Sequence, residues 1–133
     1  MSHRSYPPPV LRFLLADDDA EMRAWLRLVV RPLAASIAEA ATGAEVVDQL
    51  AAGGIDVVVT DVRMPAPNGL TAIAMARAAG VTTPALLITA YPDPAVIQAV
   101  TDLDRAMLLP KPFDVGELRA AVTALLAGDR TPP

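Results

Sequence analysis

The sequence IDVVVTDVRMP, residues 55–65, is the most informative stretch of the chain. Its centre, residues 57–59, is a run of three valines, and such a β-branched run is typical of a strand buried on both faces of a parallel sheet. The run leads to an acid, Asp61, after which the pairs Met64-Pro65 and Asn68-Gly69 break the chain into a loop. Open α/β sheets bind their ligands at the carboxyl ends of the central strands. Asp61 therefore marks a candidate site, unless it only solvates the end of the strand.

Composition narrows the function classes. The 133 residues suit one domain, and a hydrophobic share of 53% excludes disorder for the middle of the chain. A net charge of −4 with no basic run argues against direct nucleic-acid binding. Cysteines are absent, which excludes disulfides and thiol chemistry, and the one histidine, His3, lies in the polar start. Because no signal peptide or membrane-spanning run is present, we expect a soluble, cytoplasmic protein without membrane insertion.

The rest of the chain alternates strand and helix patterns around the quoted stretch. The other strands are predicted at residues 10–16, 36–41, 84–89 and 105–109, and the helices at residues 20–31, 43–52, 70–79, 94–101 and from 115 onward. Such units predict the α/β class, with a five-stranded parallel sheet of order 2-1-3-4-5 in a flavodoxin-like, doubly wound sandwich. We expect one domain over residues 10–128, a flexible Pro-rich segment over 1–9 and a flexible tail over 129–133.

Polar residues follow four of the predicted strands. Asp17 and Asp18 follow the first strand, Asp61 the third, Thr89 closes the fourth and Lys111 follows the fifth. Because parallel strands present their carboxyl ends at one edge, these side chains should converge. Each has a simpler interpretation, such as a solvated turn, a local hydroxyl bond or a surface lysine, although Lys111 is the only lysine in the chain.

Three converging carboxylates repel one another, so one of them should bind a proton unless a cation compensates. Mg2+ is the natural cation, because it prefers oxygen ligands and commonly combines one or two carboxylates with a phosphate oxygen. Lys111 adds a mobile positive charge and Thr89 a hydroxyl. Together these groups indicate phosphoryl transfer, in which an Asp can act as the nucleophile and form an aspartyl phosphate.

Taken jointly, these motifs resemble the response-regulator receiver domain of two-component signalling, of the chemotaxis-regulator type. The resemblance covers about residues 11–126. It rests on Asp17-Asp18, on Asp61 with the Met64-Pro65 and Asn68-Gly69 pairs, on Thr89-Ala90 and on Lys111-Pro112-Phe113.

The resemblance implies a phosphorelay function. Asp61 would accept a phosphoryl group from a phosphohistidine on a sensor histidine kinase or a histidine phosphotransfer protein. The Mg2+ would be bound by Asp18, Asp61 and the backbone carbonyl of Arg63, with Asp17 helping through a water molecule. The domain would promote its own phosphorylation and dephosphorylation without being a turnover enzyme.

The resemblance also assigns roles around the acceptor. Lys111 would pair with the acceptor or the phosphoryl oxygens, and its peptide bond to Pro112 is expected to be cis. Thr89 would move to bond the phosphoryl group and so switch a partner-binding surface. A downstream protein would bind the face formed by the fourth helix, the fifth strand and the fifth helix.

Two features depart from the family pattern. Many receivers carry Tyr or Phe in the fifth strand where this chain has Leu108, so the aromatic half of the switch is missing. The readout is then either weaker or carried by another group such as Tyr91, and Arg63 and Tyr91 stand where they would tune the phosphoryl lifetime. Residues 103–110 also lack the charged pattern of receivers that dimerise to drive DNA-binding domains.

Several alternatives remain open from the sequence. No DNA-binding output domain is expected within these residues, so the chain is either a stand-alone regulator or a receiver from a hybrid histidine kinase or a larger regulator. An Asp-nucleophile phosphatase is disfavoured because Asp61-Val62-Arg63 lacks a second acid. A flavin carrier is disfavoured because residues 17–19 are all acidic, and a degenerate receiver is disfavoured by the intact acids, Thr89 and Lys111.

Overall fold

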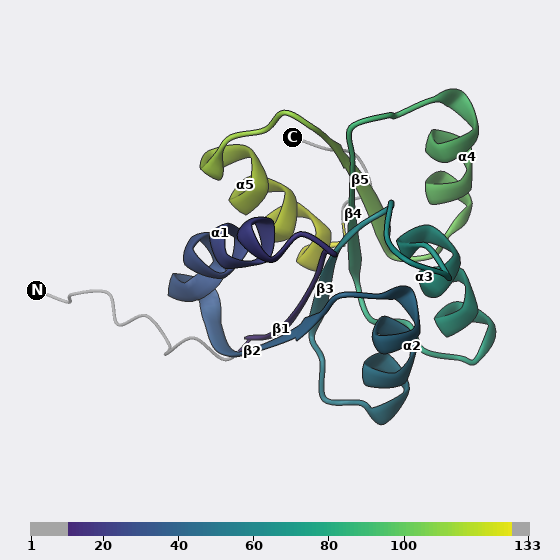
Figure 1. The fold of residues 1–133 in the computed structure, drawn as a ribbon, viewed down its shortest axis with the longest axis horizontal. Coiled ribbons are helices and arrows are strands. Elements are labelled where there is room, and N and C mark those ends of the chain that lie inside the picture. Colours follow the sequence, from purple (N-terminus) through teal and green to yellow (C-terminus); the bar gives the residue numbers. More distant parts are fainter. Residues whose placement is uncertain (1–10, 129–133) are drawn as a thin grey trace, which may run out of the picture.

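A computed structural model describes residues 11–128. Five parallel strands form one sheet in the order β2-β1-β3-β4-β5 (Figure 1). The elements are β1 (Leu11–Ala16), α1 (Ala20–Val30), the 3-10 turn η1 (Arg31–Leu33), β2 (Ala34–Ala40), α2 (Gly43–Ala52), β3 (Val57–Asp61), α3 (Gly69–Ala78), β4 (Ala85–Thr89), α4 (Pro94–Asp102), β5 (Ala106–Pro110) and α5 (Val115–Leu126). The predicted fold class and strand order are confirmed. The expected segments 1–9 and 129–133 and residue 10 lie outside the described residues.

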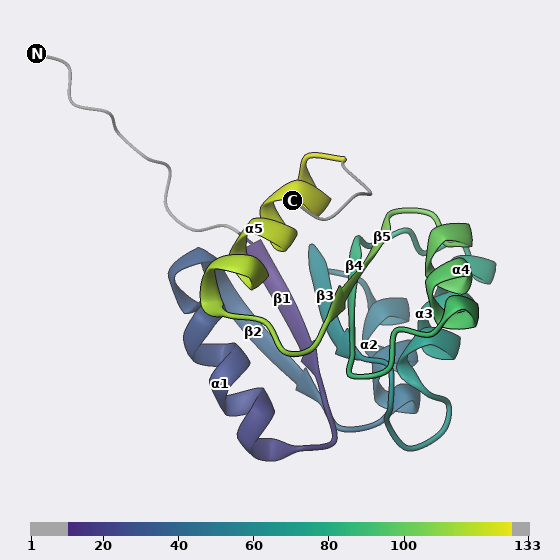
Figure 2. The same ribbon diagram turned by 90° about the horizontal axis from the view of Figure 1, so that it is seen from above.

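Helices cover both faces of the sheet. Helices α1 and α5 lie on one face, and α2, α3 and α4 lie on the other (Figure 1 and Figure 2). Because neighbouring residues of a strand point to opposite faces, β1 contributes Phe13 and Leu15 to one core and Leu14 and Ala16 to the other. All four have 0% exposure, which explains why the strands are apolar runs rather than alternating patterns.

Acidic side chains determine where the first and last helices begin. Asp19 accepts a hydrogen bond from the Glu21 N–H at 2.9 Å and caps α1. At α5, the Asp114 carboxylate accepts from the Glu117 N–H at 2.8 Å, and Glu117 accepts from the Asp114 N–H at 3.2 Å. These caps define where the loops that follow β1 and β5 end, and the parallel strand order brings both loops to one edge of the sheet.

Three of the boundaries that differ from the predictions have a clear physical reason. Strand β2 begins at Ala34, two residues earlier than expected, because parallel pairing with β1 extends a segment whose own β preference is weak. Strand β5 includes Pro110, which an edge strand tolerates. Asn68 and Gly69, which we expected in a loop, begin α3: Asn68 is its cap and accepts from the Thr71 N–H at 2.8 Å.

Candidate functional site

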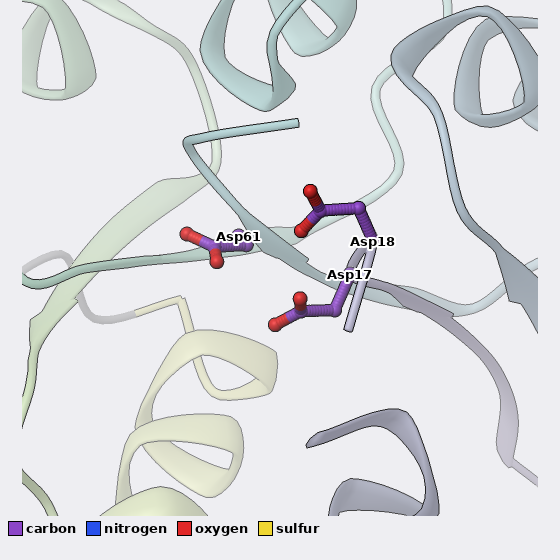
Figure 3. A group of neighbouring side chains, drawn as sticks. All are labelled: Asp17, Asp18 and Asp61. Atoms are coloured by element: carbon purple, nitrogen blue, oxygen red, sulfur yellow. The ribbon is translucent and has the colours of Figure 1, made fainter. Parts of the chain in front are cut away.

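Three carboxylates meet at the carboxyl edge of the sheet. Asp17 and Asp18 follow β1, and Asp61 ends the neighbouring strand β3. Each offers an oxygen within 4.8 Å of the others' oxygens, and Figure 3 shows the carboxylates of Asp17 and Asp18 directed to the same side as Asp61. The expected convergence of the acids is thus confirmed.

Asp17 is the buried member of the cluster, with 3% exposure. Its N–H donates to the Ala40 carbonyl at 3.1 Å, and its Oδ1 accepts from the Asp19 N–H at 2.9 Å. Burial is the main reason that its pKa rises to about 6, and the nearby Asp61 and Asp18 raise it further, against the lowering effects of the Asp19 N–H and Lys111. Charge repulsion among the acids, which we expected to favour a protonated acid, contributes to this rise, but desolvation is the larger cause.

Asp61 has a partner on each carboxylate oxygen. Lys111 Nζ lies 3.3 Å from Oδ2, and the Arg63 N–H donates to Oδ1 at 3.2 Å. The side chains of Asp61 and Lys111 are only 12% and 26% exposed, so their attraction is less screened than that of a surface pair. The Lys111–Pro112 peptide bond is cis, as expected.

Two glycines allow the loop after β3 to pack closely. A Cβ on Gly69 would lie 2.0 Å from the Asp61 carbonyl oxygen, so only glycine lets α3 begin directly against the end of β3. A Cβ on Gly43 would lie 1.6 Å from the Pro67 carbonyl oxygen, and the Gly43 N–H donates to the Pro65 carbonyl at 3.2 Å. The start of α2 therefore supports the loop that contains Arg63.

Thr89 lies at the end of the next strand and is 2% exposed. Its Oγ1 accepts from the Tyr91 N–H at 3.0 Å, and its carbonyl accepts from the Lys111 N–H at 2.8 Å. The Arg63 guanidinium stacks on the Tyr91 ring in a cation–π contact, with its carbon 4.4 Å from the ring centroid. Thr89, Tyr91 and Arg63 all line one depression of about 380 Å³.

The oxygens of the cluster fit a hard divalent cation. All three donors are carboxylates, which suit Mg2+, and only Asp17 is buried, so the cluster is open to solvent on one side. Lys111 offers one positive charge against three carboxylates, and a bound cation would relieve the remaining repulsion. Within residues 11–128, no other group of acidic or histidine side chains has this arrangement.

Comparison with known proteins assigns the family. The profile of the response regulator receiver domain matches residues 13–123. The chain belongs to this family. Receiver domains act in two-component signalling, where they interact with histidine kinases or histidine phosphotransfer proteins. None of the helices described for this receiver is long and apolar enough to cross a membrane.

Individual relatives agree with this assignment. The response regulator MprA of Mycobacterium avium is 37% identical over 125 residues, which are 92% of this receiver and 53% of MprA. The chain thus spans about half the length of the curated relatives it matches. A response regulator receiver protein from Sinorhizobium medicae superposes with a TM-score of 0.74 at 28% identity, covering 88% and 94% of the two chains. The isolated receiver domain of RcsB from Salmonella enterica gives 0.80 at 23% identity, covering 92% and 93%.

Leu108 is partly buried in β5 and lines a groove of about 380 Å³ between α4 and β5. The groove is also lined by Pro92, Ile97, Val100, Thr101, Ala106, Met107 and Pro110. No aromatic ring is among these residues. The departure from the family pattern at Leu108 therefore coincides with open space on the face that we expected to bind a partner.

Some residues that support the acids without belonging to the cluster were not predicted from the sequence. Arg23 of α1 donates to the Asp17 carbonyl at 2.6 Å and is ion-paired with Glu39 of β2 at 3.0 Å. Gly43 was expected only as part of a helix start. An arginine four residues before another on α1 is a weak signal, since it fits a solvated helix face equally well.

Proposed function

We propose that this receiver accepts a phosphoryl group on Asp61 from a phosphohistidine of its kinase or phosphotransfer partner. An Asp61 oxygen forms the new bond to phosphorus while the phosphorus–nitrogen bond breaks. The electron pair of that bond stays on the imidazole, which leaves as a neutral ring when its other nitrogen carries a proton. Later, water attacks the phosphorus, inorganic phosphate is released and the Asp61 carboxylate is regenerated.

The observation that carries this proposal is the Lys111–Asp61 ion pair beside the acid cluster. Lys111 Nζ lies 3.3 Å from Asp61 Oδ2, where it can follow the charge as the carboxylate becomes an acyl phosphate. Phosphoryl transfer depends mainly on positioning and on stabilisation of negative charge, and a single ammonium group on a flexible stem suits that task.

The same edge would hold the metal. We assign Mg2+ to the carboxylates of Asp18 and Asp61 and the backbone carbonyl of Arg63, with Asp17 acting through a water molecule. When bound, the ion neutralises charge on the phosphoryl oxygens. The buried position of Asp17 suits a residue that holds a water molecule rather than the ion itself.

Thr89 and Tyr91 would change their hydrogen bonding when Asp61 carries a phosphoryl group. The Thr89 hydroxyl accepts from the Tyr91 N–H, and it retains its own hydrogen to donate to a phosphoryl oxygen. Turning toward the phosphoryl group removes the acceptor of the Tyr91 N–H, so the loop after β4 is biased to a second arrangement. Tyr91 thereby takes the role that an aromatic residue at position 108 would have.

The output surface would be the face of α4, β5 and α5. The groove beside Leu108 is next to this loop, because Pro92 lines it and Tyr91 precedes Pro92. A change in the loop would alter the groove and with it the binding of a downstream protein.

The decisive experiment measures intact mass after incubation with acetyl phosphate and Mg2+. We expect one phosphoryl adduct on the parent, none on Asp61→Ala and one on Asp48→Ala, a control at an exposed acid of α2. An equal adduct on Asp61→Ala would overturn the assignment of the acceptor. Sustained phosphate release from a small organic phosphate would instead favour an Asp-nucleophile phosphatase.

A further inference from the structure

We propose that Arg23 is a positioning residue for the acid cluster: it holds the backbone of Asp17 in place and so sets the affinity for Mg2+. This inference rests on the proposed metal site. Arg23 lies on α1, outside the cluster, and it contacts both the Asp17 carbonyl and the Glu39 carboxylate.

The backbone of Asp17 is anchored from two sides. Its N–H donates to the Ala40 carbonyl at 3.1 Å, and its carbonyl accepts from Arg23 Nη1 at 2.6 Å. The carboxylate is held as well, because Oδ1 accepts from the Asp19 N–H at 2.9 Å. Because the N–H, the carbonyl and Oδ1 of Asp17 are all hydrogen-bonded, the other carboxylate oxygen, Oδ2, keeps a defined direction.

Arg23 can hold Asp17 because Glu39 holds Arg23. The Arg23 Nε lies 3.0 Å from Glu39 Oε1, and Nη1 of the same guanidinium donates to the Asp17 carbonyl. Arg23 therefore connects β2 to the end of β1. The planar guanidinium fixes both bonds at once, which a lysine ammonium cannot do with the same geometry. The Arg23 side chain is 19% exposed and that of Glu39 is 34% exposed, so the bond to the Asp17 carbonyl is the better shielded half of this bridge.

Arg27 provides an internal comparison. It pairs with the other oxygen of Glu39, and its side chain is 37% exposed. Arg27 and Arg23 together hold the pKa of Glu39 below its usual range, with the Arg27 hydrogen bond as the main cause. Of the contacts found, those of Arg27 reach Glu39 but not Asp17, so the two arginines share an ion pair and differ in their contact with the acid cluster.

Charge alone predicts the opposite effect of removing Arg23. A guanidinium near a cation site repels the cation, so loss of its charge should strengthen Mg2+ binding. Loss of a residue that orients a ligand should weaken binding, and changes outside the ligand set commonly reduce metal affinity by about tenfold or more. The sign of the change therefore separates positioning from simple electrostatics.

The test compares Arg23→Gln with Arg27→Gln in the full chain. Mg2+ affinity is measured by titration calorimetry, and hydrogen exchange of the Asp17 amide is measured by NMR without metal. We expect Arg23→Gln to bind Mg2+ about tenfold more weakly and to exchange the Asp17 amide faster, while Arg27→Gln stays within about twofold of the parent. If Arg23→Gln does not fold, Arg23→Lys, which keeps the charge and loses the forked geometry, takes its place with the same expectation.

Two results would overturn the proposal separately from the function. Mg2+ binding by Arg23→Gln that equals or exceeds that of the parent would reject the positioning role and leave the proposed function intact. A parent that binds no Mg2+ would reject the metal part of the proposed function and, with it, this inference.

Discussion

The Arg63 guanidinium carbon lies 4.4 Å from the centre of the Tyr91 ring, so a residue of the loop after β3 stacks on a residue of the loop after β4. The two strands are neighbours in the sheet, and Thr89 lines the same depression as this pair. The stacked pair therefore lies beside the Thr89 hydroxyl that we propose will bond a phosphoryl group on Asp61.

Removal of the Tyr91 ring should shorten the phosphoryl lifetime. A cation–π contact at an exposed site contributes about 0.5–1 kcal/mol, which corresponds to a factor of about two to five in rate. We expect Tyr91→Ala to lose its phosphoryl group faster by that factor, and Tyr91→Phe, which keeps the ring face, to match the parent. The decay of the adduct followed by intact mass measures this. Equal decay in the parent and Tyr91→Ala would exclude a protective role.

Replacement of Lys111 should slow phosphorylation without weakening the binding of Mg2+. Lys111→Met keeps the length of the side chain and removes the charge that lies 3.3 Å from Asp61 Oδ2. We expect phosphorylation by acetyl phosphate to slow by about a hundredfold, as happens when one stabilising donor is removed from a transfer site. Mg2+ affinity should stay equal or rise, because one positive charge has left the cluster. A parallel loss of Mg2+ binding would show that Lys111 acts mainly by holding the acids in place.

The raised pKa of Asp17 predicts how stability depends on pH in the metal-free protein. Between the ordinary value of 3.8 and about 6, the unfolded chain releases this proton and the folded chain keeps it. The contribution of Asp17 to the free energy of unfolding therefore falls as pH rises through this window, by at most about 1.4 kcal/mol per pH unit, and is constant above it. Because other charged side chains lie beside Asp17, the comparison must be made with Asp17→Asn.

Urea unfolding at pH 4, 5, 6 and 7 in the presence of a chelator checks this prediction. The parent should lose stability relative to Asp17→Asn over this range, and Mg2+ should restore it at pH 7 in the parent. A constant difference between the two proteins from pH 4 to pH 7 would mean that Asp17 titrates at its ordinary value.

A side chain at Gly43 should displace the loop that contains Arg63. In Gly43→Ala the new Cβ would lie 1.6 Å from the Pro67 carbonyl oxygen, so the backbone must move. We expect a loss of about 1–3 kcal/mol in the free energy of unfolding, together with weaker Mg2+ binding. The matched control is Gly116→Ala in α5, where the nearest atom is 3.3 Å away on a side chain and alanine favours the helix. Equal stability of the two variants would contradict the close packing at Gly43.

Local patterns in the sequence were sufficient for the fold and for the convergence of the acids. The valine run of β3 and the acids after β1 and β3 are contiguous features, and parallel topology brings the ends of these strands together without knowledge of any side-chain contact. The caps at Asp19 and Asp114 could likewise be predicted, because a cap depends only on residues within one helical turn.

Contacts between distant segments could not be predicted in this way. The pairing of Arg23 with Glu39 depends on how α1 lies over the edge strand β2. The fit of Gly43 against Pro67 depends on the path of a loop that contains irregular backbone, including a cis bond before Pro67. The pKa of Asp17 depends on how deeply its carboxylate is buried, which the order of residues does not specify.

The chain has one lysine, and its amine lies 3.3 Å from Asp61 Oδ2. Reductive methylation with isotope-labelled formaldehyde therefore marks a single side chain besides the α-amino group, and the methyl groups on Lys111 lie inside the site. Their chemical shifts would follow the charge and the modification of Asp61 in real time, in crude mixtures with a kinase and without any substitution. Because nearly all basic residues in this sequence are arginines, Lys111 is a natural attachment point for a spectroscopic probe beside Asp61.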